Sequence, residues 1–183
     1  MIAKKAAGAI VVLLLVSGSA DAANVRFELK AQYFRPTEKA FLDIYGAGLR
    51  YGGEIDIGLW KGFDVWLGGG YFSREGELTF TKERSNLKII PIGLGLKYRW
   101  TKGVIGFYTG AGLSIFIYEE TSPLGKVSQS RGGLTAEMGS YVKIVGGLLI
   151  DLYLNYSTSQ VETADFKVDI GGLGVGIGLA YEF

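Results

Sequence analysis

The sequence predicts an all-β fold, an eight-stranded antiparallel up-and-down transmembrane β-barrel. Three observations lead to this prediction. Large apolar residues alternate with small or polar ones over long segments, short connections alternate with long ones, and the chain ends in GGLGVGIGLAYEF, with glycine on alternate positions. Alternation with a period of two indicates strands that have one apolar face.

The composition indicates one folded domain and excludes several classes of function. The chain has 183 residues, of which 48% are hydrophobic and 20% are charged, with 19 Lys and Arg against 18 Asp and Glu. This balance gives no signal for a nucleic-acid partner. Cysteine and histidine are both absent, which removes disulfides, thiolate nucleophiles, imidazole bases and ordinary zinc, copper or haem ligand sets. We therefore expect no cofactor and no metal.

Residues 1–22 have the pattern of a secretory signal peptide. Lys4 and Lys5 precede an apolar run over residues 9–16, and Ala20-Asp21-Ala22 forms a small-x-small cleavage site. An uncleaved helical anchor would need about 18 apolar residues, more than this run offers. We expect cleavage after Ala22, export towards the bacterial outer membrane, and a barrel domain over residues 23–183.

Eight alternating segments follow, most of them 10 to 16 residues long. Soluble strands usually have about five or six residues, whereas a tilted strand needs about 9 to 11 to cross a bilayer. The predicted strands are Val25–Arg35, Gly48–Trp60, Phe63–Arg74, Leu87–Trp100, Val104–Tyr118, Gly133–Val145, Leu148–Gln160 and Lys167–Phe183.

The connections between these segments alternate in length. Tight turns follow the second, fourth and sixth segments, at WKGF, WTKG and VGG. Longer polar stretches follow the others, at PTEKAFLDIYGA, EGELTFTKERSN, EETSPLGKVSQSRG and VETADF. Outer-membrane barrels have short periplasmic turns and long outer loops, so both chain ends are predicted to lie on the turn side.

The volume of the barrel decides which face points outwards. A soluble barrel would place its apolar face inside, but an eight-stranded barrel has an interior that side chains only just fill. Five or six large residues from every strand cannot fit there, so residues such as Leu94 and Leu96 must face lipid and Gly93 and Gly95 the lumen. A change of phase predicts a bulge at Gly171-Gly172.

Aromatic residues are predicted to form two girdles at the membrane interfaces, as is typical of such barrels. One girdle lies near the turns and the other near the loops. The first comprises Trp60, Phe63, Trp100, Tyr181 and Phe183, and the second Tyr33, Tyr71, Phe116, Tyr118 and Tyr156.

These features resemble the small eight-stranded outer-membrane barrels, such as OmpX and the membrane domain of OmpA. The resemblance covers the whole of residues 23–183 and includes the terminal Tyr181-Glu182-Phe183. It implies that Tyr181 and Phe183 belong to a signal read by the barrel-assembly machinery. In contrast to full-length OmpA-like proteins, we expect no peptidoglycan-binding domain after the last strand, so tethering to the cell wall is not implied.

Inward positions carry charges of both signs, which predicts a lumen plugged by ion pairs because buried charges are costly unless paired. We expect Arg50, Lys97 and Arg99 to face Glu54, Asp56 and Glu137. Barrel shear sets the actual neighbours, so individual pairs cannot be read from the sequence. The candidate lumen residues are Arg26, Glu28, Lys30, Arg50, Glu54, Asp56, Asp64, Lys97, Arg99, Glu137, Lys143 and Asp151, with Glu182 at the chain end.

Catalysis is not expected, because no histidine base is present. A Ser-Lys pair, Ser140 or Ser157 with Lys143, is formally possible, but Ser140 falls on the lipid face. The GxG repeats lack the helix and acidic partner of a dinucleotide site, so packing in the lumen explains them better.

The loops are therefore where we expect function. Phe41, Leu42, Ile44 and Tyr45 are candidates to cap the barrel mouth or to touch a ligand, and GELTFTKERSN is a candidate β-ribbon. The predicted function is a non-enzymatic outer-membrane protein that supports envelope integrity or presents loops for adhesion. The alternative is a narrow channel for small or hydrophobic molecules. Expected partners are outer-membrane lipid, lipopolysaccharide, the assembly machinery and an extracellular partner of the loops, and we expect a monomer.

Overall fold

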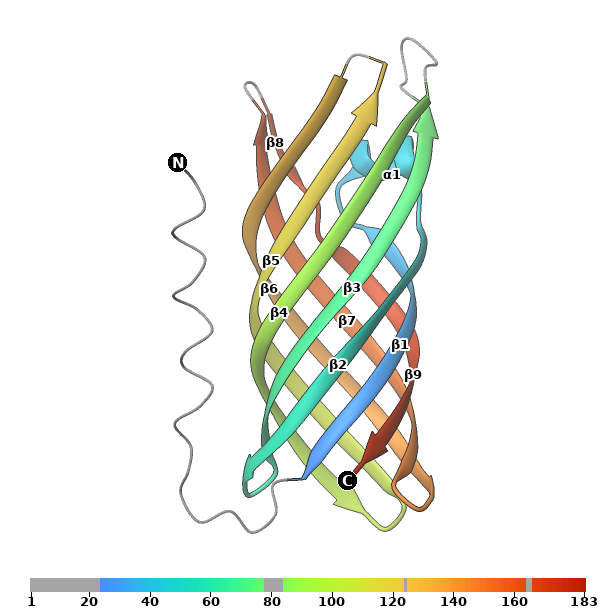
Figure 1. Ribbon diagram of the computed structural model, residues 1–183, viewed down its shortest axis with the longest axis vertical. Coiled ribbons are helices and arrows are strands. Elements are labelled where there is room, and N and C mark those ends of the chain that lie inside the picture. The colour runs from blue at the N-terminus through green and yellow to red at the C-terminus, as the bar shows by residue number, and fades with distance from the viewer. Residues whose placement is uncertain (1–23, 78–83, 124, 164–165) are drawn as a thin grey trace.

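Eight antiparallel strands close into a barrel in the computed structural model, which describes residues 24–77, 84–123, 125–163 and 166–183 (Figure 1). The predicted signal peptide, residues 1–22, lies outside the described residues. Each strand pairs with its neighbours in chain order, and pairing of β1 with β9 closes the ring. The ring consists of β1 (Val25–Pro36), β2 (Gly48–Trp60), β3 (Phe63–Glu77), β4 (Arg84–Lys102), β5 (Ile105–Ser122), β6 (Gly125–Val145), β7 (Leu148–Thr163) and β9 (Gly172–Glu182).

Tight turns join the strands at the end of the barrel where the C-terminus lies (Figure 1). Lys61 and Gly62 have φ angles of 47° and 85°, and Gly146 and Gly147 have 57° and 91°. Two successive left-handed residues match the right-handed twist of a hairpin. These turns lie where the alternation of connection lengths predicted them.

The opposite end of the barrel has more regular structure than the sequence predicted. β5 and β6 continue to a Ser122–Gly125 pair, so β6 begins at Gly125 and not at the predicted Gly133. Above the membrane these strands need no apolar face, and apolar alternation therefore does not mark them. The first loop contains a helix, α1 (Lys39–Tyr45), which was not predicted. Among the described residues, no helix is long and apolar enough to cross a membrane.

The last predicted strand is divided in two. β8 (Phe166–Asp169) pairs only with β7, and the chain leaves the strand at Ile170 and Gly171, one residue before the predicted bulge. The cause is Asp169, whose Oδ1 accepts hydrogen bonds from the backbone N–H groups of Gly171 (2.7 Å) and Ser159 (2.9 Å). These bonds turn the chain into β9.

Large apolar side chains cover the outside of the barrel, as predicted. Leu29 and Leu113 are each 71% exposed, although they lie in the middle of the wall. Eight of the ten predicted girdle aromatics are also exposed, but the prediction was wrong for Phe116 and Tyr118. Phe116 is 1% exposed inside the barrel, because it shares the inward parity of Ser114 on the same strand.

An arginine in the middle of this apolar belt should hinder insertion. We expect Leu94→Arg to destabilise the folded barrel by about 2 to 4 kcal/mol, because the guanidinium would lie in hydrocarbon. Reversible unfolding in lipid vesicles measures this change. The control is Val145→Arg next to a turn, where the cost falls to about 0 to 1 kcal/mol. Equal effects at the two positions would contradict the orientation of the barrel.

Candidate functional site in the barrel lumen

The lumen is shaped by aromatic side chains that lie across glycines on neighbouring strands. Tyr108 pairs in register with Gly139, and a Cβ atom at Gly139 would lie 2.7 Å from the tyrosine ring. Tyr153 pairs in register with Gly176 of β9, and its ring lies across that glycine in the same way. Such close approach excludes any larger residue at these glycines. The inward glycines thus make room for rings within a narrow cylinder.

At the turn end, ion pairs converge on Glu182. Its carboxylate accepts from Arg26 (3.2 Å) and Arg99 (3.0 Å), and Lys143 lies 3.5 Å away. Arg99 also pairs with Asp64, through Nη2 at 2.8 Å. We call these ion pairs the Glu182 layer. The Lys143 side chain is 48% exposed, so the Glu182 layer is in contact with water at the barrel rim.

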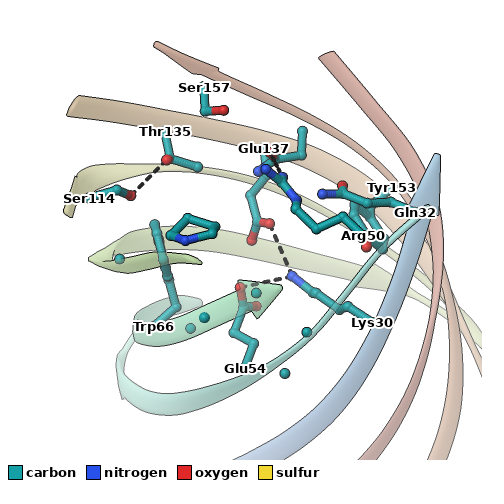
Figure 2. A pocket seen from close by; sticks show the side chains of 18 of the residues that line it. Lys30, Gln32, Arg50, Glu54, Trp66, Ser114, Thr135, Glu137, Tyr153 and Ser157 are labelled. Atoms are coloured by element: carbon teal, nitrogen blue, oxygen red, sulfur yellow. Dashed lines mark hydrogen bonds and ion pairs between the residues drawn. The ribbon is translucent and has the colours of Figure 1, made fainter. Parts of the chain in front are cut away.

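The centre of the lumen holds a compact network of two lysines and three carboxylates. Lys97 Nζ contacts Asp56 Oδ1 at 3.1 Å and Glu137 Oε1 at 2.8 Å, and it also pairs with Glu54. Lys30 Nζ bridges Glu54 (2.8 Å) and Glu137 (3.0 Å), as Figure 2 shows. Lys97 is fully buried, so these pairs take the place of its hydration.

Two further carboxylates, Glu28 and Asp151, lie beside this network. Asp151 Oδ2 accepts a hydrogen bond of 2.6 Å from the Tyr108 hydroxyl. Glu28 is 4% exposed, and neither of its oxygens has a hydrogen-bond partner among the described residues.

Above the network, Arg50 is buried without a carboxylate partner among the described residues. Its Nη2 donates to Asn155 Oδ1 at 2.8 Å, and its guanidinium lies 4.6 Å from the centre of the Phe34 ring. Gln32 accepts from it as well, once its amide is oriented with the oxygen towards the guanidinium. Arg50, Lys30 and Ser157 line a cavity of about 80 Å³ (Figure 2), room for a few water molecules.

An apolar cap, which α1 completes, lies at the loop end of the lumen. Phe41 and Tyr45 of α1 are buried against inward residues of the strands. The Tyr45 hydroxyl donates to Glu120 at 2.6 Å, and burial together with this carboxylate raises the pKa of Tyr45 above its usual range. The buried cap comprises Phe34, Phe41, Tyr45, Phe72, Leu87, Ile89, Phe116 and Ile170.

The structure brings most of the candidate lumen residues together, but in other pairs than expected. Lys97 meets all three expected acids, whereas Arg99 pairs with Asp64 and Glu182, and Arg50 with no acid in the described ranges. Lys30 takes the second central position instead. Barrel shear decides which residues share a level, and the sequence does not state it.

Sequence analysis missed the inward tyrosines, Tyr108, Tyr141 and Tyr153. They share the parity of glycines and charges on their strands, and each faces a glycine across a strand pair. That parity was the signal that could have identified them.

The formally possible Ser-Lys pairs are not assembled. Ser140 pairs with outward Leu152 and Phe107 on the lipid face. Ser157 is buried and lies in register with Gly172 near the loop end, while Lys143 lies near the turns, opposite Leu149.

No family model and no curated protein matches the sequence. Solved structures do match. Neisserial surface protein A has 13% identity and a TM-score of 0.66, over 87% of this chain and 97% of that one. OprG of Pseudomonas aeruginosa has 15% identity and a TM-score of 0.66, over 88% of this chain and 96% of that one. Ail of Yersinia pestis, in complex with a heparin analogue, has 16% identity and a TM-score of 0.57, over 87% of this chain and 99% of that one. The chain has the fold of the small eight-stranded outer-membrane barrels.

Removing the Lys97 ammonium should disrupt the ion pairs around it and destabilise the barrel. We expect Lys97→Met to destabilise the barrel by about 3 to 5 kcal/mol, because three buried carboxylates lose a partner. Urea unfolding of the protein in vesicles measures the loss. The control is Lys126→Met, which breaks a loop-end pair with Glu119 whose side chains are 58% and 34% exposed, and should cost less than about 1 kcal/mol. A similar loss in both variants would contradict the central role of Lys97.

Proposed function

We propose that the chain is a non-enzymatic outer-membrane protein whose lumen is closed to solutes and whose loop end supports envelope integrity or contacts partners. One observation carries the proposal. Any axial path crosses the Glu182 layer, then the network of Lys30 and Lys97, and then the apolar cap. Among the described residues, these buried ion pairs and packed rings support a lumen that is closed to solutes.

The outward face supports a location in the bacterial outer membrane. Its exposed apolar belt is bordered by aromatic residues, and OprG is by name an outer-membrane protein. Export would use residues 1–22. Tyr181 and Phe183 are exposed on the outside, with ring centres 4.7 Å apart, where the assembly machinery could read them.

The loop end supports contact with the outer leaflet and with partners. Ail, by name an attachment invasion locus protein, was solved with a heparin analogue. In this chain outward Lys88 lies opposite Glu119, just above outward Ile90 and Ile117. Basic and acidic side chains therefore both occur at this height of the barrel. This mixture fits contact with lipopolysaccharide phosphates and their bridging cations at least as well as binding of a polyanion. Shortened β5–β6 hairpins, scored separately for detergent resistance of cells and for cell attachment, would separate the two roles.

The absence of catalysis is also part of the proposal. The sequence has no histidine or cysteine, and neither Ser140 nor Ser157 meets Lys143. Hydrolase assays on the purified protein in lipid test this part.

A closed lumen predicts that the barrel conducts no ions. In planar bilayers we expect no stable single-channel steps, because ions would have to cross the ion-pair layers and the cap. A variant with residues 39–45 replaced by a Gly-Ser linker should also be silent, since the layers below the cap remain. Large and stable conductance steps in the full barrel would overturn the proposal.

A second candidate, a lateral route for small hydrophobic molecules, is favoured by a weak point in the wall. The β3–β4 ladder lacks the pairs of Gly70 and Tyr71 with Pro91 and Ile90, because proline has no N–H to donate. Glycines of β2 and β3 flank the gap, and Gly53, Gly68 and Gly69 line both the lumen cavity and a groove on the outer face.

Uptake of a small apolar solute into liposomes distinguishes the two functions. For a closed barrel we expect no uptake above that of protein-free liposomes, in the native chain and in Pro91→Ala alike. A lateral route would instead give uptake by the native chain that falls in Pro91→Ala, where the ladder can close. That result would replace the first proposal with the second.

A further inference from the structure

A second cavity lies at the loop end of the barrel, where α1 and β8 lie (Figure 1). Its volume is about 200 Å³, and its walls come from α1, β5, β6 and the β8 segment. It lies on the loop side of Phe116, because Tyr118 and Glu120 follow that residue on the inward face of β5. Val127 of β6 also lines it and is 45% exposed. A ligand can therefore enter from outside without crossing the lumen.

Glu120 is the only acidic or basic residue in the described lining of this cavity. Its Oε1 accepts hydrogen bonds from the hydroxyls of Tyr45 (2.6 Å) and Ser85 (3.1 Å), and its Oε2 accepts one from Tyr118. A carboxylate offers about four lone-pair sites, so these three bonds fix its position and leave one site open. Hydroxyl donors are neutral and do not cancel its charge.

The described residues give Glu120 no cationic partner. The basic side chain nearest in the β5–β6 register, Lys126, is held by outward Glu119 at 3.2 Å. Gln129, which also lines the cavity, has its Oε1 atom buried without a hydrogen-bond partner among the described residues. The polar side of the cavity therefore offers two acceptors and one negative charge, and it calls for a positively charged donor.

The rest of the lining is aromatic or aliphatic. The ring centres of Phe41 and Tyr45 lie 5.2 Å apart on α1, and Tyr118 adds a third ring. The faces of aromatic rings attract organic cations. Ile44 and Ile170 supply aliphatic surface beside them, which suits the hydrocarbon part of a ligand.

We propose that this cavity binds a small organic amine in its protonated form. The ammonium group donates to the open site on Glu120 and to Oε1 of Gln129, and the hydrocarbon part packs among the rings of α1 and β5. The volume is below the roughly 300 to 1,000 Å³ of sites for drug-sized molecules, so the ligand is compact. One carboxylate among rings does not suit a metal ion, since Ca²⁺ takes six to eight oxygen ligands.

Calorimetric titration of the full chain, refolded in lipid vesicles, tests the site. The probe is 2-phenylethylamine hydrochloride, with protein-free vesicles as the blank for uptake into the bilayer. We expect saturable binding of one amine per chain. The neutral analogue 2-phenylethanol has the same size but no charge for Glu120, so it should bind about tenfold more weakly or less.

Glu120→Gln removes the charge and keeps the shape of the side chain. It should weaken binding of 2-phenylethylamine by about tenfold or more, because a hydrogen bond to a charged group is lost. Gln129→Leu should also weaken binding and serves if Glu120→Gln fails to fold. The control is Glu119→Gln, the neighbouring acid on the outward face of β5, which should bind the amine like the native chain.

Three results would contradict the amine site. Equal affinity of the amine for the native chain and for Glu120→Gln, or for Gln129→Leu in its place, would locate binding elsewhere on the protein. Equally tight binding of 2-phenylethanol would show an apolar pocket without preference for a cation. Heats no larger than those of protein-free vesicles would show a cavity that holds only water. None of these outcomes depends on whether the lumen conducts ions or on the loop function proposed above.

Discussion

The limited volume inside an eight-stranded cylinder is the constraint on which the rest of this structure depends. Several inward rings lie against a glycine, as Tyr108 lies against Gly139 and Tyr153 against Gly176. The indole of Trp66 lies across Gly93, Gly95 and Gly112 in the same way. The glycines that weaken each strand locally therefore allow dense packing across the lumen, and the large apolar side chains are left to the outer face.

The same narrowness governs the electrostatics. A wide channel would hydrate Lys97, but here its ammonium is fully buried and must be solvated by Glu54, Asp56 and Glu137. Two of these acids are shared, because Lys30 pairs with Glu54 and Glu137 from the other side. Such sharing links β1, β2, β4 and β6 through the centre, in addition to the hydrogen bonds around the wall. The lumen network thus acts as a cross-brace of the barrel.

Sequence analysis could predict the ring but not its contents. Alternation along β4, with Leu94 and Leu96 outside and Gly93 and Gly95 inside, follows from local pattern and barrel volume alone. The partners of Arg50 and Arg99 depend on the stagger between distant strands, which no local pattern encodes. α1 and the extension of β6 to Gly125 form beyond the membrane, where the apolar period that identified the strands no longer applies.

The barrel changes its internal chemistry along its axis. Within the apolar belt the lumen combines ion pairs with buried tyrosines, whereas towards the loops Phe72, Ile89 and Phe116 turn inwards and α1 packs onto them. This end is built like the core of a water-soluble protein, held by apolar burial, while the centre is held by ion pairs. The two parts should therefore respond to different conditions, the cap to denaturant and the centre to the charges it contains. Because they are separate, loops above the cap can vary without disturbing the ion pairs that brace the wall.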